Sequence, residues 1–285
     1  MKPASFEYHR PGSPSEAASL LSKYDSAAVV AGNQTLGMDM SYREVEPDHL
    51  VDIGDLDLAF VEIRGDKISI GATTIHRTLA QSDLLAGKIQ ALTEAASKVA
   101  DPSVRSIGTF GGSLGKAHPS ANYPTVFAAL ETTLTIRTTD DTREMDFGDY
   151  LVDGLDGGFI ESVMVSLDGF GEPEAGSAFV QLKRAKLTWP TVNAVAAVRT
   201  EDGVVTDARV GLANITPTHV RVPDAATAVV DTELGEAALK AAADAAIDVA
   251  DPTPELHADG EFKIEMAGEY ATRALKKAYE RATVS

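Results

Sequence analysis

Two glycine-rich segments carry residue types that can hold an anion without a charged side chain. The first glycine loop, Val29–Gly37, is an apolar run that ends in Gly32 and continues in small polar residues. The second glycine loop, Ser106–Gly115, is richer still in glycine. Backbone N–H groups in such turns can converge on a phosphate, and glycine lets the phosphate approach closely. Each segment therefore predicts either a pyrophosphate cradle or simply a tight turn after a strand.

Neither loop has the signature of a common nucleotide site. A Walker A loop needs Gly-Lys-Ser/Thr, which follows neither segment. A Rossmann site needs GxGxxG at the start of a long helix, and that pattern is also missing. The residues by themselves leave the identity of the anion open.

Histidines and nucleophiles give no local sign of catalysis. No two histidines stand at i, i+4 or at HxH spacing, so local spacing predicts no metal site. No G-x-S-x-G elbow supports a Ser–His–Asp triad. We predict no catalytic side chain and no metal ligand. The six histidines are His9, His49, His76, His118, His219 and His257.

Composition excludes several classes of function. The 285 residues include 25 Lys and Arg, 43 Asp and Glu and no Cys, for a net charge of −18. Without cysteine there are no disulfides, thiolate zinc sites, cysteine nucleophiles or cysteine-ligated iron–sulfur clusters. The acid excess argues against nucleic-acid and anionic-membrane partners. Scattered acid with few lysines predicts a salt-adapted host, with an ordinary acidic cytosolic protein as the alternative.

No targeting or membrane segment is visible. Residues 1–16 have no apolar core of a signal peptide. No stretch approaches the roughly 18 consecutive apolar residues of a membrane span. We expect a cytoplasmic protein without membrane insertion.

The elements around the glycine loops are predicted from periodicity and breakers. A mixture of helices and antiparallel hairpins, without regular βαβ alternation, favours an α+β protein. The Gly/Pro/acid stretch 169–174 is the best domain boundary. Helices are expected after Ser13 and over 92–99, 123–130, 233–250 and 265–281, and strands over 27–31, 50–53, 61–64, 67–70, 133–137, 178–183, 192–200 and 204–212.

Several motifs then follow one another along nearly the whole chain. They are Phe6-x-Tyr8-x-x-Pro11, Ala31-Gly32-Asn33-Gln34-Thr35-Leu36, Ile70-Gly71-Ala72-Thr73-Thr74, Val104–Leu114, His118–Pro124 and Glu269–Leu275. In this order they resemble the FAD-binding medium subunit of the molybdenum hydroxylases. That family includes carbon monoxide dehydrogenase medium chains and the flavin domain of xanthine dehydrogenase. The segment 104–114 with its flanks is the most specific part of the resemblance.

Five positions depart from the family pattern. Asn33 stands for a Gly, Ser106 and Ser113 for Asn, and His118 and Asn122 for Asp. Asn visits left-handed backbone angles more readily than most residues, and the amide of Asn122 can still accept and donate. Phosphate binding by the backbone should therefore survive these changes.

The resemblance implies a layout and a set of contacts. An FAD-binding domain of the vanillyl-alcohol oxidase/PCMH type would span residues 1–172. A C-terminal domain, a three-stranded antiparallel sheet packed with helices, would span 173–285. Both glycine loops would hold the pyrophosphate of non-covalent FAD through backbone N–H groups. The implied cofactor-binding residues are Val30, Ala31, Gly32, Asn33, Gln34, Thr35, Leu36, Thr109, Phe110, Gly111, Gly112, Ser113, Asn122, Ile160 and Lys183.

The resemblance also implies an electron-transfer role within a larger complex. Electrons would pass from a molybdenum cofactor on a large subunit, through [2Fe–2S] clusters on a small subunit, to FAD here and then to an external acceptor. A chain without cysteine cannot ligate those clusters, so they are expected only on the partners. The alternatives are a self-contained flavin-dependent oxidase or reductase, and a scaffold that has lost its cofactor.

Overall fold

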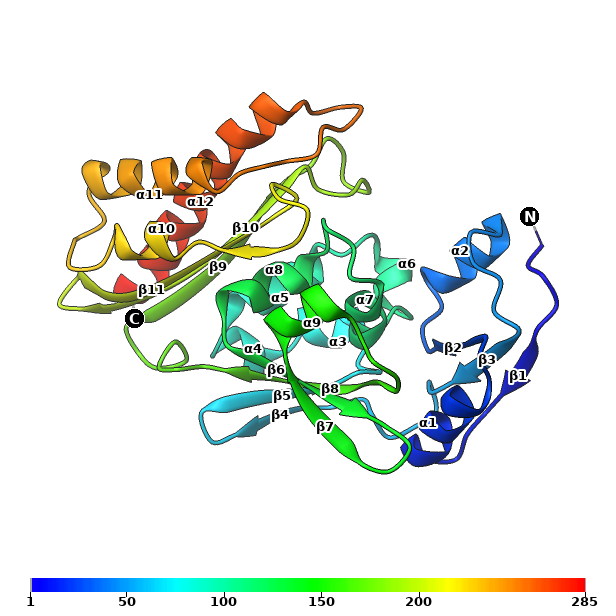
Figure 1. Ribbon diagram of the computed structural model, residues 1–285. Coiled ribbons are helices and arrows are strands. Elements are labelled where there is room, and N and C mark those ends of the chain that lie inside the picture. The colour runs from blue at the N-terminus through cyan, green and yellow to red at the C-terminus, as the bar shows by residue number, and fades with distance from the viewer. Residues whose placement is uncertain (1, 285) are drawn as a thin grey trace. The chain divides into compact units, whose positions relative to one another are not determined.

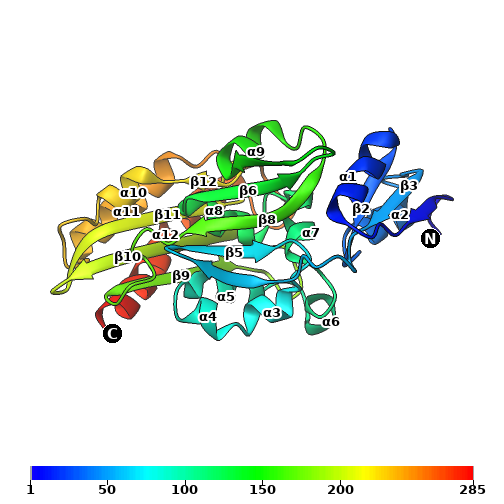
Figure 2. The ribbon, with the colours of Figure 1, turned by 90° about the horizontal axis from the view of Figure 1, so that it is seen from below.

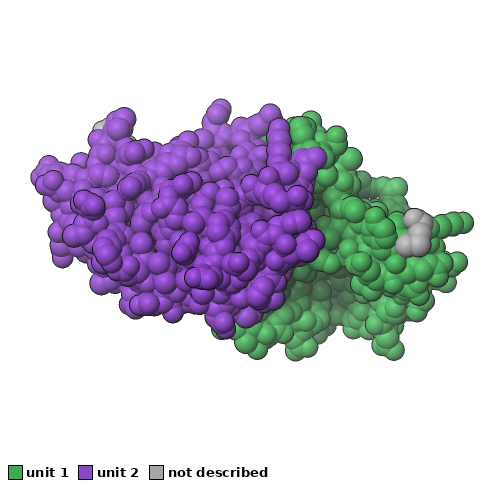
Figure 3. Space-filling view, turned by 90° about the horizontal axis from the view of Figure 1, so that it is seen from above, with its two compact units in different colours: residues 1–78, 101–117, 132–165 green, residues 79–100, 118–131, 166–285 purple. Residues whose placement is uncertain are grey.

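The computed structural model describes residues 2–284 and divides into two compact units, coloured separately in Figure 3. Unit 1 comprises residues 1–78, 101–117 and 132–165, and unit 2 comprises 79–100, 118–131 and 166–285. The units thus interleave along the chain. The predicted division into sequence domains at residues 1–172 and 173–285 is a different division and stays a prediction. Among residues 2–284, no helix combines the length and apolar character that a membrane crossing requires.

The first part of unit 1 is a small parallel sheet in the order β1-β3-β2 (Figure 1). Neighbouring residues of β3 point to opposite faces of the sheet, and a different helix packs on each face. Val51 packs with Ala17 of α1, and Leu50 packs with Met40 of α2. The side chain of Ser13 caps α1 by accepting from the N–H of Glu16, as the sequence predicts. The elements are β1(Glu7–His9), α1(Pro14–Lys23), β2(Ala27–Val30), α2(Leu36–Tyr42) and β3(His49–Asp52).

The rest of unit 1 centres on a five-stranded sheet in the order β4-β5-β8-β6-β7, of which Figure 2 shows the neighbouring strands β5, β8 and β6. The predicted hairpin of 61–64 with 67–70 is confirmed as β4 and β5. Buried and partly exposed residues alternate strictly along β6, as expected for a sheet with one face on the core. The elements are β4(Val61–Arg64), β5(Lys67–Gly71), α3(His76–Ala80), α6(Pro102–Arg105), α7(Phe110–Lys116), β6(Thr132–Arg137), β7(Thr142–Asp146), α9(Phe147–Asp153) and β8(Phe159–Ser166).

Unit 2 is built on an antiparallel sheet in the order β12-β11-β10-β9. The three predicted strands are its long members, and the two-residue β12 adds a fourth. Helices cover both faces: a Cβ on Gly176 would lie 2.1 Å from the carbonyl oxygen of Ala278 in α12, whereas the neighbouring Ser177 accepts from Ala91 of α5. Two-sided burial explains why β10 is almost continuously Val and Ala. The elements are α4(Asp83–Ala86), α5(Gln90–Ser97), α8(Asn122–Ala129), β9(Ala175–Leu182), β10(Val192–Glu201), β11(Val204–Ala213), β12(Val220–Arg221), α10(Pro223–Thr227), α11(Glu236–Asp248) and α12(Gly260–Thr283).

One carboxylate in unit 2 binds a backbone group at the open edge of the unit's sheet. Glu94 of α5 accepts from the backbone N–H of Phe179 in the edge strand β9 at 2.9 Å. The same carboxylate pairs with Lys277 at 2.5 Å and Arg281 at 2.7 Å, both on α12. Lys98, one turn beyond Glu94, donates to the carbonyl of Phe179 at 2.9 Å. Both backbone groups that β9 would otherwise leave unpaired at this residue are therefore satisfied.

Removal of the Glu94 charge should weaken unit 2. Burial alone would raise the pKa of Glu94, but the hydrogen bonds from Arg281, Lys277 and the Phe179 N–H outweigh it and hold the pKa below its ordinary value. We expect Glu94→Gln to lower the free energy of unfolding at pH 7 by about 1–3 kcal/mol. Thermal denaturation followed by circular dichroism measures this as a fall in Tm of several degrees.

The exposed Glu233 provides the matched control. Glu233→Gln should change stability by no more than about 0.5 kcal/mol. Because the folded-state pKa of Glu94 is lowered, its contribution is present above the ordinary value of 4.5 and is lost as the pH falls below it. Equal Tm values for the two variants at pH 7 would contradict this role of Glu94.

Candidate functional site

The two glycine loops lie against each other within unit 1, although their sequences are far apart. A Cβ on Gly32 would lie 2.3 Å from the carbonyl oxygen of Ile107 and 2.8 Å from the Cα of Gly108. No real Cβ tolerates such distances from backbone atoms. Residue 32 must therefore be glycine for the backbone of the first loop to meet the backbone of the second.

The first loop leaves a row of backbone donors without protein partners. After β2, the N–H groups of Gly32, Asn33, Gln34 and Thr35 donate to no acceptor among residues 2–284. Asn33 has φ of 55°, which is the left-handed conformation anticipated for an Asn in place of Gly. The side chain of Gln34 folds back and donates to the carbonyl of Gly32 at 2.9 Å. Unpaired N–H groups in a turn are what a pyrophosphate requires.

The second loop is more ordered than its glycine content suggests. The sequence predicts a loop from Gly108 to Gly115, but residues 110–116 form the short helix α7. The hydroxyl of Thr109 caps this helix by accepting from the N–H of Gly112, which offsets the poor helix propensity of its glycines. The N–H groups of Phe110 and Gly111 donate to Thr74 and Ala72 at 2.8 Å each.

The Ile70–Thr74 motif packs directly against the second loop and accepts its hydrogen bonds. A Cβ on Gly111 would lie 2.6 Å from the Cβ of Ala72, so this approach also depends on glycine. Thr73 in the same motif is buried, and its hydroxyl makes no hydrogen bond within residues 2–284. Spacing alone did not single out Thr73; the only signal was its place in this motif.

His76 supports the second loop from below. Its backbone N–H donates to the carbonyl of Gly108 at 3.1 Å. A Cβ on Gly108 would lie 3.0 Å from Cδ2 of the His76 ring, so the ring fills the space beside this glycine. Burial, with a smaller contribution from the positive charge of Arg105, lowers the pKa of His76 to about 4. The imidazole is therefore neutral at neutral pH.

The remaining predicted site residues lie outside the two loops. Ile160 is buried in β8 of unit 1. Asn122 and Lys183 belong to unit 2, where Asn122 begins α8 and donates to the carbonyl of Ala95 at 2.9 Å. Lys183 follows β9 and donates to the carbonyl of Lys98 at 3.0 Å. Within unit 1 the structure thus brings together the residues of the two loops, while Asn122 and Lys183 are described only within unit 2.

These features define an α+β protein in which a glycine loop with unpaired N–H groups packs against a second glycine loop. The family described as "FAD binding domain in molybdopterin dehydrogenase" matches residues 4–165, and "CO dehydrogenase flavoprotein C-terminal domain" matches residues 177–278. The chain therefore belongs to the family of FAD-binding subunits of molybdopterin dehydrogenases. This confirms the predicted family and the predicted fold class.

Similar proteins align over the full length of the chain. The carbon monoxide dehydrogenase medium chain of Hydrogenophaga pseudoflava is 31% identical, with 99% of each chain covered. A subunit of the 6-hydroxypseudooxynicotine dehydrogenase complex of Paenarthrobacter nicotinovorans is also 31% identical, over 99% of this chain and 97% of that one.

Solved structures agree with these relatives. Reconstituted CO dehydrogenase from Oligotropha carboxidovorans gives a TM-score of 0.93 at 29% identity, covering 99% of this chain and 100% of that one. Quinoline 2-oxidoreductase from Pseudomonas putida 86 gives 0.92 at 25% identity, with 99% of each chain covered.

Acid should destabilise the loop region through His76. A histidine whose folded-state pKa lies below its ordinary 6.5 takes up a proton on unfolding, so stability falls as the pH drops from about 6.5 toward 4. In His76→Gln this proton uptake, at most about one per molecule, is absent, and Tm should decline less over that range. Thermal melts at pH 7, 6 and 5 measure the difference.

The control for His76 is the exposed His257. His257→Gln should keep the wild-type dependence of Tm on pH. Some acid sensitivity will remain in every variant, because burial also lowers the pKa of His219 in unit 2 to about 4. Superimposable pH profiles of wild type and His76→Gln would argue against the buried neutral imidazole.

Proposed function

We propose that this chain is the FAD-carrying, electron-transferring subunit of a molybdenum-containing hydroxylase or dehydrogenase. The observation that carries the proposal is the unpaired row of N–H groups in the first loop, held against the second loop in a family named for FAD binding. Bound FAD supplies redox chemistry that exchanges electrons with other carriers. The protein's own task is to bind and orient that cofactor.

The residues present fit a pyrophosphate better in the first loop than in the second. Gly32–Thr35 have free donors, whereas Phe110 and Gly111 already donate to carbonyls of the motif behind them. We assign direct N–H contacts to the first loop. To Thr109, Gly112 and Ser113 we assign a supporting role at the start of α7, where Ser113 donates its N–H to Thr109 at a long 3.2 Å.

The other proposed contacts follow from the family. We keep Val30, Ala31 and Leu36 as flanks of the first loop, and Asn122, Ile160 and Lys183 as contacts to the remainder of FAD. The cofactor is expected to be held without a covalent bond. No side chain of this chain is proposed as an acid, base or nucleophile.

The partners are inferred from chemistry and from the names of the relatives. Those relatives are called medium chains or subunits of larger dehydrogenases. This chain has no cysteine for iron–sulfur ligation, so any clusters that feed electrons to its FAD belong to another polypeptide. We propose a small iron–sulfur subunit and a large molybdenum subunit as partners. A cytoplasmic location and a salt-adapted host stay predictions from the sequence.

The Gly32 contact can be tested through FAD affinity. Gly32→Ala places a methyl group against Ile107 and must displace the first loop, so the Kd for FAD should rise at least about tenfold. Gly115→Ala is the matched control, because no atom lies within 4 Å of a Cβ at that position. Titration of apoprotein with FAD, followed by flavin fluorescence, measures both. Unchanged affinity in Gly32→Ala would contradict the cradle.

The electron-transfer role can be tested by composition and by turnover. Tagged chain purified from its source should bring two further polypeptides, together with molybdenum and about four iron atoms per FAD, the content of two [2Fe–2S] clusters. Substrate should reduce the flavin only in that complex. Reduction of flavin by a small organic substrate in the isolated chain would instead favour the self-contained oxidase or reductase.

A further inference from the structure

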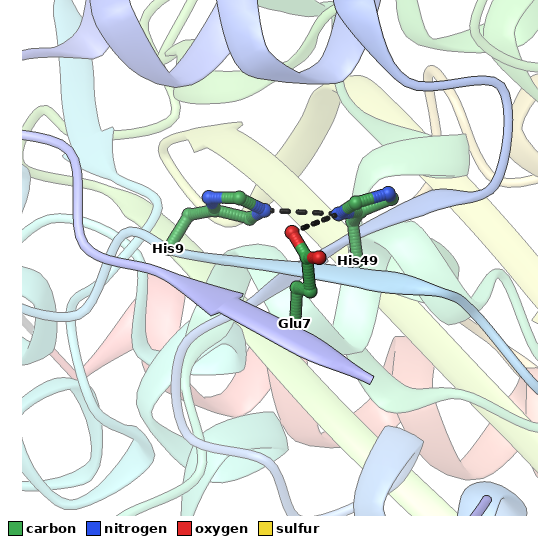
Figure 4. A group of neighbouring side chains, drawn as sticks. All are labelled: Glu7, His9 and His49. Atoms are coloured by element: carbon green, nitrogen blue, oxygen red, sulfur yellow. Dashed lines mark hydrogen bonds and ion pairs between the residues drawn. The ribbon is translucent and has the colours of Figure 1, made fainter. Parts of the chain in front are cut away.

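Three potential metal ligands come together at the parallel pairing of β1 with β3 (Figure 4). The register places Glu7 opposite His49, and His9 lies two residues further along β1. Nε2 of His9 is 3.0 Å from Nδ1 of His49, and a carboxylate oxygen of Glu7 is 3.6 Å from the same Nδ1. Figure 4 shows these two nitrogens turned toward each other beside the carboxylate, with the second nitrogen of each ring pointing away.

The distances from Nδ1 of His49 to the other two ligand atoms are similar to those between ligands of one metal ion. Ligands bound at about 2.0–2.1 Å in a tetrahedron lie about 3.3 Å from one another. The two distances around Nδ1 of His49 bracket that value, and the three ligand atoms lie within 4.8 Å of one another. The side chain of Glu7 is 72% exposed, which leaves its carboxylate room to rotate toward the two rings.

The two imidazoles are held in place by an aromatic neighbour. The ring of Tyr24, just after α1, stacks on His49 with centroids 3.8 Å apart and on His9 with centroids 5.2 Å apart. Both histidines are half-buried. Such support lowers the entropy that binding must overcome, as in sites whose ligands are oriented before the metal arrives.

We propose that Glu7, His9 and His49 bind one divalent metal ion of the zinc type, with water completing the coordination. Two imidazole nitrogens and one carboxylate suit Zn²⁺ and its first-row neighbours, whereas Mg²⁺ and Ca²⁺ prefer oxygen ligands. The ion takes the place of the hydrogen bond between the rings and ties β1 to β3. None of these residues takes part in the proposed flavin site, so the two proposals stand independently.

The test uses the full chain after treatment with a chelator. We expect calorimetric titration with Zn²⁺ to give one equivalent bound, and Co²⁺ to give the intense visible absorption of a four-coordinate site. Zn²⁺ should also raise Tm, because an ion that binds only the folded state stabilises it. Wild-type protein that binds no Zn²⁺ beyond the scattered binding of its acidic surface would overturn the proposal.

Variants distinguish this site from general attraction of cations by an acidic chain. His9→Gln and His49→Ala should abolish the stoichiometric binding, and Glu7→Gln should weaken it by at least about tenfold. Each variant should keep the wild-type circular dichroism spectrum and cooperative thermal transition, which shows that it folds. His257→Gln, a histidine outside the cluster, should bind Zn²⁺ as wild type does. One equivalent of Zn²⁺ bound with wild-type affinity by His9→Gln would refute the assignment.

Discussion

The proposed flavin site depends on one backbone-to-backbone contact, between Gly32 and Ile107. The space at Gly32 is too small for any side chain, and the neighbouring approaches at Gly108 and Gly111 are also filled, by His76 and Ala72. The first loop, the second loop and the Ile70–Thr74 motif therefore pack backbone against backbone without a ligand. A site that is ordered in advance loses little conformational entropy on binding, which favours a cofactor held without a covalent bond.

The two loops also differ in which backbone N–H groups are left without a partner. In the second loop, the N–H groups of Phe110 and Gly111 donate to carbonyls of the Ile70–Thr74 motif, and residues 110–116 form α7. The second loop thereby becomes the rigid support, and the first loop is left with the free donors. Close packing requires glycine in both loops, at Gly32 against Ile107 and at Gly111 against Ala72.

Local patterns predicted the five longest helices and eight of the twelve strands within residues 2–284, because alternation, helical spacing and caps are short-range signals. The hairpin at 61–70 and the helix capped by Ser13 are confirmed for that reason. The helical form of residues 110–116 was missed, because glycine propensity points to a loop and only the Thr109 cap and tertiary packing overrule it. The pairing of His9 with His49 was beyond any spacing rule, since it follows from the register of two strands 40 residues apart.

The 25 basic residues of the chain are not all at the surface. Several of them serve as internal ties: Lys263 is fully buried and donates to Glu255 at 2.9 Å, and Arg137 is largely buried and pairs with Glu161. Each of these pairs contains one acid and one base and carries no net charge, so the net charge of −18 belongs to the other ionised side chains. Salt screens exposed charges strongly and half-buried pairs much less. High salt would therefore relieve the repulsion among surface acids while leaving the buried and half-buried pairs in place, and this is the physical argument behind the predicted salt-adapted host.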